Sequence, residues 1–339
     1  MRRLLIFLTL ILVVLAVLWA LAETFVAREL RTGLAGQPDI RVAETAPLRN
    51  PARIGARLTG IEATLPGTRI ALPRLDLSAR SLRPNHFVAD LPQRIEIRHL
   101  GQSFDLGLTA PQATFSLASL RQMTLGHLRI GAEAVTLNGK PLAAPLRLSL
   151  QPVAPDGDWP EGARSAYDVG LHVEALDPAA LPGFTPPEGW PEGRITAQGQ
   201  GRVWLDRLVD PQAASGGQPP RPVALELAET RLTVGHMSAS LAARLRPDAQ
   251  GRAEGIAVLY TADAQPIVET LAALGLIPQN AVLMLQAMMR GAAENPMPAT
   301  VDFRPAQGDE IRLPLVFADG QVLFGGVPVA EAPLLIGAP

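Results

Sequence analysis

The sequence predicts a mainly β protein: a large antiparallel sheet array, twisted or partly open, with two short helices late in the chain and one transmembrane helix at its start. Three observations predict this fold class. Apolar residues alternate with polar or small residues along most of the chain, which is typical of strands with one buried face. The 32 prolines and 30 glycines fall mostly between these alternating runs. A separate apolar segment occupies the amino terminus.

Residues 1–22 form that segment and predict a membrane anchor. Arg2 and Arg3 precede an apolar run, Leu4 to Ala22, in which Thr9 is the only polar residue. A helix of this length spans roughly 28 Å, close to the hydrocarbon thickness of a bilayer. The side chains expected inside the membrane are Leu4, Leu5, Ile6, Phe7, Leu8, Ile11, Leu12, Val13, Val14, Leu15, Val17, Leu18 and Trp19.

The charges around this run predict the topology. Because both arginines lie before the apolar residues, we expect a cytoplasmic amino terminus, a single pass of the bacterial inner membrane, and a periplasmic body. Ala20-Leu21-Ala22 also fits the cleavage site of a signal peptide, which is the second interpretation, and a buried core helix is the third. The first two interpretations both place the body outside the cytoplasm.

Residues 23–36 have helical composition and predict a stalk, and residues 37–339 form the β-rich body. A low-complexity stretch makes 207–222 a possible domain seam. At Pro73 the apolar positions change from even to odd numbers, which predicts a bulge or a bend. The residues chosen to mark the apolar face of the sheet are Ile70, Leu72, Ile95, Ile97, Val169, Leu171, Leu225, Leu227, Leu313 and Leu315.

Two tight turns and two helices complete the predicted elements. Asn138-Gly139 and Asp319-Gly320 each stand between alternating runs, which predicts hairpins whose central residues have positive φ. Asp263 is expected to cap a helix that ends at Gly275, and a second, largely apolar helix is expected over 281–293. We expect the second helix to pack on the sheet, with contact to a membrane or another chain as the alternative.

The composition and the motifs indicate no catalysis and no cofactor. The absence of cysteine excludes disulfides, thiol catalysis and cysteine-ligated zinc, and the five histidines are scattered. Gly199-Gln200-Gly201-Arg202 lacks the residues that complete a phosphate loop and leads into a strand pattern. A formal net charge of −2 provides no basic face for nucleic acid, so we expect no nucleic-acid partner.

The chain resembles a known family. The resemblance rests on the Arg-Arg leader, the β-rich body and the two late helices. It also rests on the C-terminal segment, which runs from Leu313 through Asp319-Gly320 and Val327-Pro328-Val329 to Pro333. These features resemble the alphaproteobacterial family called domain of unknown function 2125, which has no established activity. The architecture is also distantly similar to AsmA-like envelope proteins, which implies a role in phospholipid movement.

These observations predict a non-catalytic protein whose apolar sheet face binds lipid acyl chains or an envelope protein, at the inner membrane. The alternative is an interaction scaffold with a closed core, and an enzyme of unrecognised type is third. An open face and a closed core have the same alternating pattern, so the sequence does not distinguish between them.

Overall fold

The computed structural model describes residues 23–335, apart from 25–26, 29–30, 33–38, 51–52, 66, 81–82, 120–123, 156–158, 183, 187–189, 191–192, 210–219, 274–281, 283–286 and 288–302. The predicted anchor, residues 1–22, and most of the predicted seam lie outside this part. Within the described residues, no helix is long and apolar enough to cross a membrane. Six described residues of the predicted stalk, between Glu23 and Thr32, are helical.

The described residues form a mainly β fold with nineteen strands, in which every strand pair with a defined register is antiparallel. The chain divides into two compact units, with the boundary after Lys140. That boundary follows the Asn138-Gly139 turn, which joins β9 (Ala134–Leu137) to β10 (Lys140–Ala143), and falls after the first residue of β10. Asn138 and Gly139 have φ values of 51° and 78°, the positive values that the sequence predicts for this hairpin.

Unit 1 is a sheet that forks. Its central strand, β3, pairs with β2 along its whole length on one side, but with two strands in succession on the other. One branch runs from β3 through β4 and β7 to β8, and the other from β3 through β5 and β6 to β9. The remaining strands are β1 (Ile40–Pro47), β2 (Arg53–Leu65), β3 (Thr68–Arg80), β4 (Arg83–Asp90), β5 (Arg94–His99), β6 (Gln102–Thr109), β7 (Gln112–Ser119) and β8 (Thr124–Ala132).

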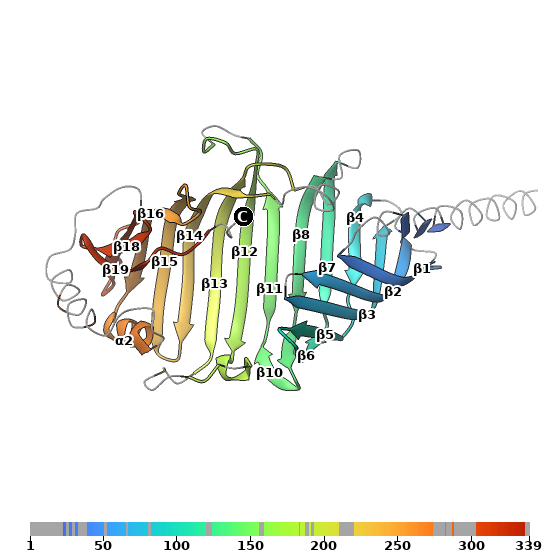
Figure 1. Ribbon diagram of the computed structural model, residues 1–339, viewed down its shortest axis with the longest axis horizontal. Coiled ribbons are helices and arrows are strands. Elements are labelled where there is room, and N and C mark those ends of the chain that lie inside the picture. Colours follow the sequence, from blue (N-terminus) through green and yellow to red (C-terminus); the bar gives the residue numbers. More distant parts are fainter. Residues whose placement is uncertain are drawn as a thin grey trace, which may run out of the picture. The chain divides into compact units, whose positions relative to one another are not determined.

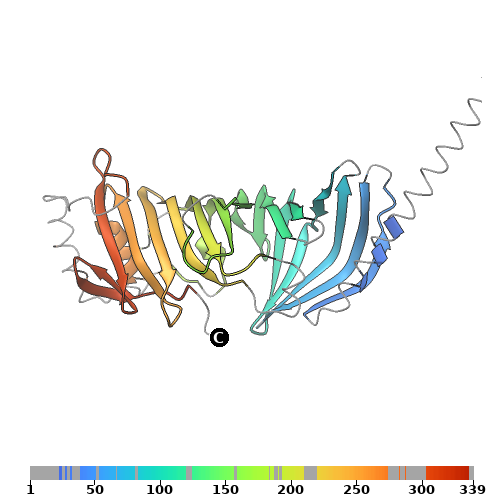
Figure 2. The ribbon, with the colours of Figure 1, turned by 90° about the horizontal axis from the view of Figure 1, so that it is seen from above.

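Pro73 lies at the fork. The pairing of β2 with β3 keeps one register on both sides of Pro73, so the predicted bulge is absent from this pair. Instead, β3 pairs with β5 before Pro73 and with β4 after it. Proline lacks the N–H that a ladder needs, which suits a position where one partner strand ends and another begins. Figure 2 shows the first, blue strands of this unit as long and strongly curved.

Unit 2 is a meander, in which each strand from β11 to β19 pairs with the next along the chain. Figure 1 shows β11 to β15 as one row of neighbouring strands. The strands are β11 (Leu146–Pro152), β12 (Ser165–Leu176), β13 (Ile195–Leu205), β14 (Pro222–Val234), β15 (Met237–Pro247), β16 (Ala253–Thr261), β17 (Ile311–Ala318), β18 (Gln321–Phe324) and β19 (Val327–Glu331). A 3-10 helix, η1 (Pro178–Ala180), follows β12.

Helix α2 (Gln265–Ala273) interrupts this meander between β16 and β17. The Asp263 carboxylate accepts a hydrogen bond from the Gln265 N–H at 3.1 Å, as expected of a cap. Of the predicted helix over 281–293, the described residues Val282 and Ala287 are helical. The turn at Asp319 and Gly320 joins β17 to β18 with φ values of 52° and 71°, again the predicted positive values.

Candidate apolar binding face

Strand register places the apolar side chains of unit 2 on one side of its sheet. Opposite residues in neighbouring strands share a face, so rows can be followed from strand to strand. The first row crosses seven strands: Leu148, Leu171, Gly199, Thr230, Leu241, Leu259 and Leu313. The second row crosses eight: Leu150, Val169, Gly201, Leu227, Ala243, Ala257, Leu315 and Phe324.

Two further rows flank these. One contains Tyr167, Val203, Leu225, Leu245, Gly255, Phe317 and Val322, and the other contains Val173, Ala197, Leu232, Ala239, Thr261 and Ile311. We call these four rows the apolar face of unit 2. The structure therefore brings six of the predicted residues onto one face: Val169, Leu171, Leu225, Leu227, Leu313 and Leu315.

The other four predicted residues lie in unit 1, on the branch through β5. Ile70 is opposite Ile97, which is opposite Phe104, and Ile95 is opposite Leu106. Leu72 is opposite Ile61 of β2 and also lines a hollow of about 560 Å³ that includes Arg94 and Glu96. The ten predicted residues are thus two separate groups, one in each unit.

One end of the apolar face of unit 2 is covered. Ala264 and Val268, from α2 and the residue before it, pack with Leu313, Val322, Phe324 and Val329 in a buried cluster. Leu259, Leu315 and the helical residue Val282 pack against this cluster. Phe324 retains only 2% exposure, so this end of the face is a closed core.

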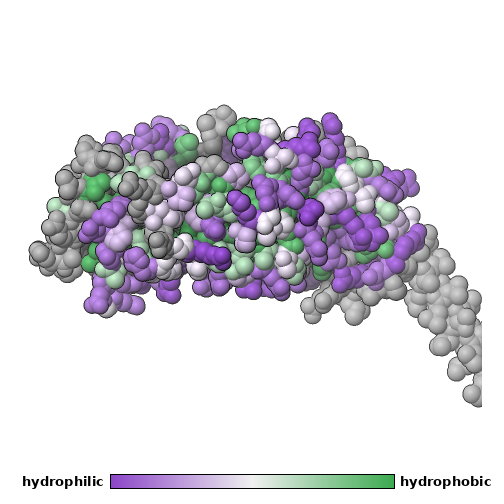
Figure 3. Space-filling view, turned by 90° about the horizontal axis from the view of Figure 1, so that it is seen from below, coloured by the Kyte–Doolittle hydropathy of each residue, from purple (hydrophilic) through white to green (hydrophobic). Residues whose placement is uncertain are grey.

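The other end of the same face is open. Leu171 on β12 is 39% exposed and Leu232 on β14 is 44% exposed, while Val169, Leu225 and Leu227 are half-buried. The buried apolar cluster on this face lies at the β17 end. At the β12 end, Leu171 and Leu232 present aliphatic side chains to solvent, whereas Tyr167 and Val173 in the flanking rows are 4% and 8% exposed. Figure 3, a view from below, shows apolar and hydrophilic residues intermixed on the surface of the molecule.

The reverse side of β12 to β16 carries ion pairs. Arg202 and Asp168 form one at 2.7 Å, Arg244 and Glu226 one at 3.1 Å, and Arg246 and Glu254 one at 3.0 Å. On β15 and β16 this side also holds a buried apolar cluster of Ala242, Val258 and Tyr260. The Gly199-Gln200-Gly201-Arg202 segment lies within β13, where Gln200 and Arg202 belong to this reverse side. Gly199 is required by close packing, because a Cβ there would lie 2.4 Å from Thr230 Oγ1.

An ion-pair cluster around the largely buried Asp76 carboxylate, in unit 1, was not predicted from the sequence. The Asp76 carboxylate accepts hydrogen bonds from Arg57 at 2.9 and 3.0 Å, and from Arg74. Burial alone raises the pKa of Asp76, but the hydrogen bonds from Arg74 and Arg57 outweigh it and lower that pKa to about 2. The one local signal is the Arg74-Leu75-Asp76 spacing, which places both charges on the same face of β3. The cluster joins β2 to β3, so we assign it a structural role.

The described residues contain no group of three or more histidine, aspartate or glutamate side chains arranged to hold a metal ion. The strongly shifted carboxylate, Asp76, is bound by two arginines and so is not available as a general base. What the geometry offers is an apolar face with one covered and one open end.

Comparison with known proteins identifies the family. No curated protein sequence matches the chain, and no solved structure matches it. One family does match, over residues 20–333, and its description is uncharacterized protein conserved in bacteria. Since this match covers nearly the whole chain, the protein belongs to the DUF2125 family.

Proposed function

We propose that this chain is a non-catalytic, inner-membrane-anchored periplasmic protein that binds acyl chains of envelope lipids. The acyl chains lie on the open end of the apolar face of unit 2. The observation that carries this proposal is the exposure of Leu171 and Leu232 in rows that are mostly apolar from strand to strand.

The hydrophobic effect supports an apolar occupant on these rows. Apolar surface removed from water stabilises a complex by about 25 cal/mol per Å², or about 0.8 kcal/mol for each buried methylene group. An acyl chain is a linear series of such groups, and neighbouring leucines on adjacent strands supply contacts along it. Large contiguous apolar patches on soluble domains usually mark sites that bind a partner, a ligand or a membrane.

The polar reverse side supports a one-sided binding mode. The ion pairs of Arg202 with Asp168 and of Arg244 with Glu226 are partly exposed, so each contributes about 0 to 1 kcal/mol to stability. Their charged groups keep that side of the sheet hydrated. A lipid therefore has an apolar surface on one side of β11 to β14 only.

The membrane anchor and the periplasmic location rest on the sequence of residues 1–22. An anchored domain with an exposed aliphatic face lies close to a source of lipid, which fits a role in lipid handling. The distant resemblance to AsmA-like envelope proteins points to the same role.

Photocrosslinking in living cells tests the proposal with two adjacent positions. A benzophenone amino acid replaces Leu171, on the apolar face, in the full-length chain. In the control it replaces His172, the next residue, whose side chain lies on the polar side. We expect lipid adducts, identified by mass spectrometry of the purified protein, to be several-fold more abundant at position 171 and to fractionate with the inner membrane.

Two results would contradict lipid binding on this face. Equal lipid labelling at both positions means that the probe reports proximity to the membrane alone. A protein adduct at position 171, with no lipid, favours the interaction scaffold instead.

A further inference from the structure

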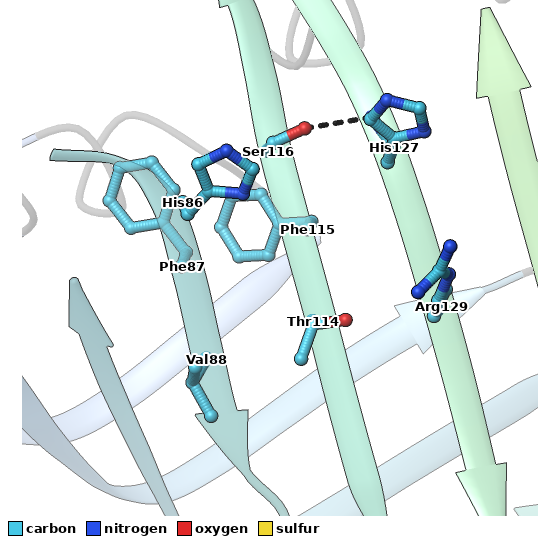
Figure 4. Close-up of a pocket in the computed structure, with 8 residues that line it drawn as sticks. All are labelled: His86, Phe87, Val88, Thr114, Phe115, Ser116, His127 and Arg129. Carbon is cyan, nitrogen blue, oxygen red and sulfur yellow. Dashed lines mark hydrogen bonds between the residues drawn. The ribbon is translucent and has the colours of Figure 1, made fainter. Parts of the chain in front are cut away.

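A hollow of about 300 Å³ lies on the branch of unit 1 that contains β4, β7 and β8 (Figure 4). Strand register arranges its polar side chains in two rows across these three strands. His86 of β4 is opposite Ser116 of β7, and His127 of β8 lies beside Ser116. In the next row, Thr114 of β7 is opposite Arg129 of β8. The whole site belongs to unit 1.

The lining of this hollow carries positive charge without an acidic side chain. It includes an arginine and two histidines but no aspartate or glutamate. Several other strand arginines pair with carboxylates on neighbouring strands, as Arg202 does with Asp168 and Arg246 with Glu254. No carboxylate of the described residues forms an ion pair with Arg129. The hollow therefore combines positive charge with an absence of internal counter-charge.

The hydroxyl groups add hydrogen-bond donors to this charge. Ser116, at 4% exposure, accepts a hydrogen bond from the His127 backbone N–H at 2.9 Å. A hydroxyl that accepts through oxygen still has its own O–H to donate. Gly126 holds Ser116 closely, since a Cβ on Gly126 would lie 2.8 Å from Ser116 Oγ. The position of the Ser116 hydroxyl is thus fixed by two neighbours on β8.

The backbone beneath the hollow is also well supported. Phe87 and Phe115, adjacent in sequence to His86 and Ser116, stack at 4.8 Å with an interplanar angle of 11°. Both residues also line the hollow. Stacked aromatic rings on neighbouring strands stabilise the pairing of β4 with β7. The polar side chains next to them in sequence are therefore presented by a rigid support.

We propose that this hollow binds a phosphate group, either free or as the headgroup of a phospholipid. Arg129 supplies the charge and a planar set of donors that suits phosphate oxygens. The Ser116 and Thr114 hydroxyls and the two imidazoles supply further N–H and O–H donors. The outer strands, β4 and β8, are two strand spacings or about 10 Å apart, so side chains from both reach a small anion over β7.

Calorimetric titration of the full-length protein in a neutral detergent tests this site with two acyl-free probes, inorganic phosphate and glycerol 3-phosphate. Neither probe carries an alkyl chain, so binding is independent of the apolar face of unit 2. We expect saturable binding of at least one probe, weakened about 10- to 100-fold by Arg129→Gln, the range for a lost hydrogen bond to a charged group. Tighter binding of glycerol 3-phosphate indicates a lipid headgroup, and tighter binding of phosphate indicates the free anion.

Arg202→Gln is the matched control, since it removes an arginine that is paired on a strand of unit 2. It is expected to leave both affinities unchanged, and the thermal unfolding of both variants checks that they fold. His127→Gln, which keeps a side-chain N–H donor, is expected to weaken binding less than Arg129→Gln. The proposal is overturned if neither probe binds, or if Arg129→Gln and Arg202→Gln bind the probes equally.

Discussion

The two ends of the apolar face of unit 2 have the same sequence pattern but different surroundings. At the β17 end, Leu313 and Phe324 are covered by α2 and are almost inaccessible to solvent. At the β12 end, Leu171 lies in the same row as Leu313 but is 39% exposed. The difference comes from the element inserted between β16 and β17, since α2 has no described counterpart over β11 to β14. Alternation therefore specifies which side of a sheet is apolar, and a separate segment of chain decides whether that side becomes a core.

The largest expected effect is at the covered end. Phe324→Ala removes a buried aromatic side chain from a closed cluster, so we expect a loss of about 3–5 kcal/mol in the free energy of unfolding. Leu232→Ala at the open end should cost less than about 1 kcal/mol, because the leucine is already 44% exposed. Urea unfolding of the full chain, followed by circular dichroism, measures both. Equal losses would show that the two ends are covered alike.

The comparison extends to two ion pairs, for which we expect a smaller effect on the free energy of unfolding. The Asp76 side chain is 10% exposed and bound by two arginines, whereas the Asp168 side chain, paired with Arg202, is 51% exposed. We expect Asp76→Asn to cost about 2 kcal/mol at neutral pH, and Asp168→Asn at most about 0.5 kcal/mol.

The pH dependence of stability distinguishes the two carboxylates further. Because the folded-state pKa of Asp76 is lowered to about 2, its contribution is fully present above the unfolded pKa of about 4 and is lost as the pH falls through about 2. Melting temperatures measured from pH 5 to pH 2 should therefore fall less steeply for Asp76→Asn than for the unmodified chain. Parallel slopes for the two proteins would contradict the assignment.

At the open end, the effect on stability should be small and the effect on binding large. Replacing Leu171 and Leu232 together by asparagine should change the free energy of unfolding by less than about 2 kcal/mol, since neither side chain is fully buried. The same change should reduce the lipid recovered with the purified protein several-fold. His172→Asn, on the polar side, is the control. Undiminished lipid recovery from the double variant would place the lipid elsewhere.

Much of the fold was predictable from local pattern. Period-two alternation marked the strands, and Asn138-Gly139 and Asp319-Gly320 marked hairpin turns with positive φ. These features depend on neighbouring residues only. The six predicted residues from Val169 to Leu315 share one face because meander pairing keeps opposite residues in register.

Other features depended on partners distant in sequence and could not be predicted. The fork at Pro73 arises because β3 pairs with both β4 and β5. The alternation of apolar residues within β3 does not indicate which strands lie beside it. The hollow lined by His86, Ser116 and Arg129 forms because β4 pairs with β7, although β5 and β6 lie between these two strands in the sequence. The boundary at Lys140 has no compositional signal, because a tight Asn-Gly hairpin occurs within domains as readily as between them.

The sequential pairing in unit 2 has a consequence for how this unit folds and evolves. Each strand from β11 to β19 contacts its chain neighbours, so the mean sequence separation of its contacts is short and folding can propagate strand by strand. A hairpin inserted into such an array replaces one strand pairing by three and leaves all the others unchanged. Each inserted hairpin lengthens the sheet by two strand spacings, or about 10 Å. Unit 2 is thus built so that insertion or deletion of hairpins changes its length in equal steps, while the fork of unit 1 admits no such change.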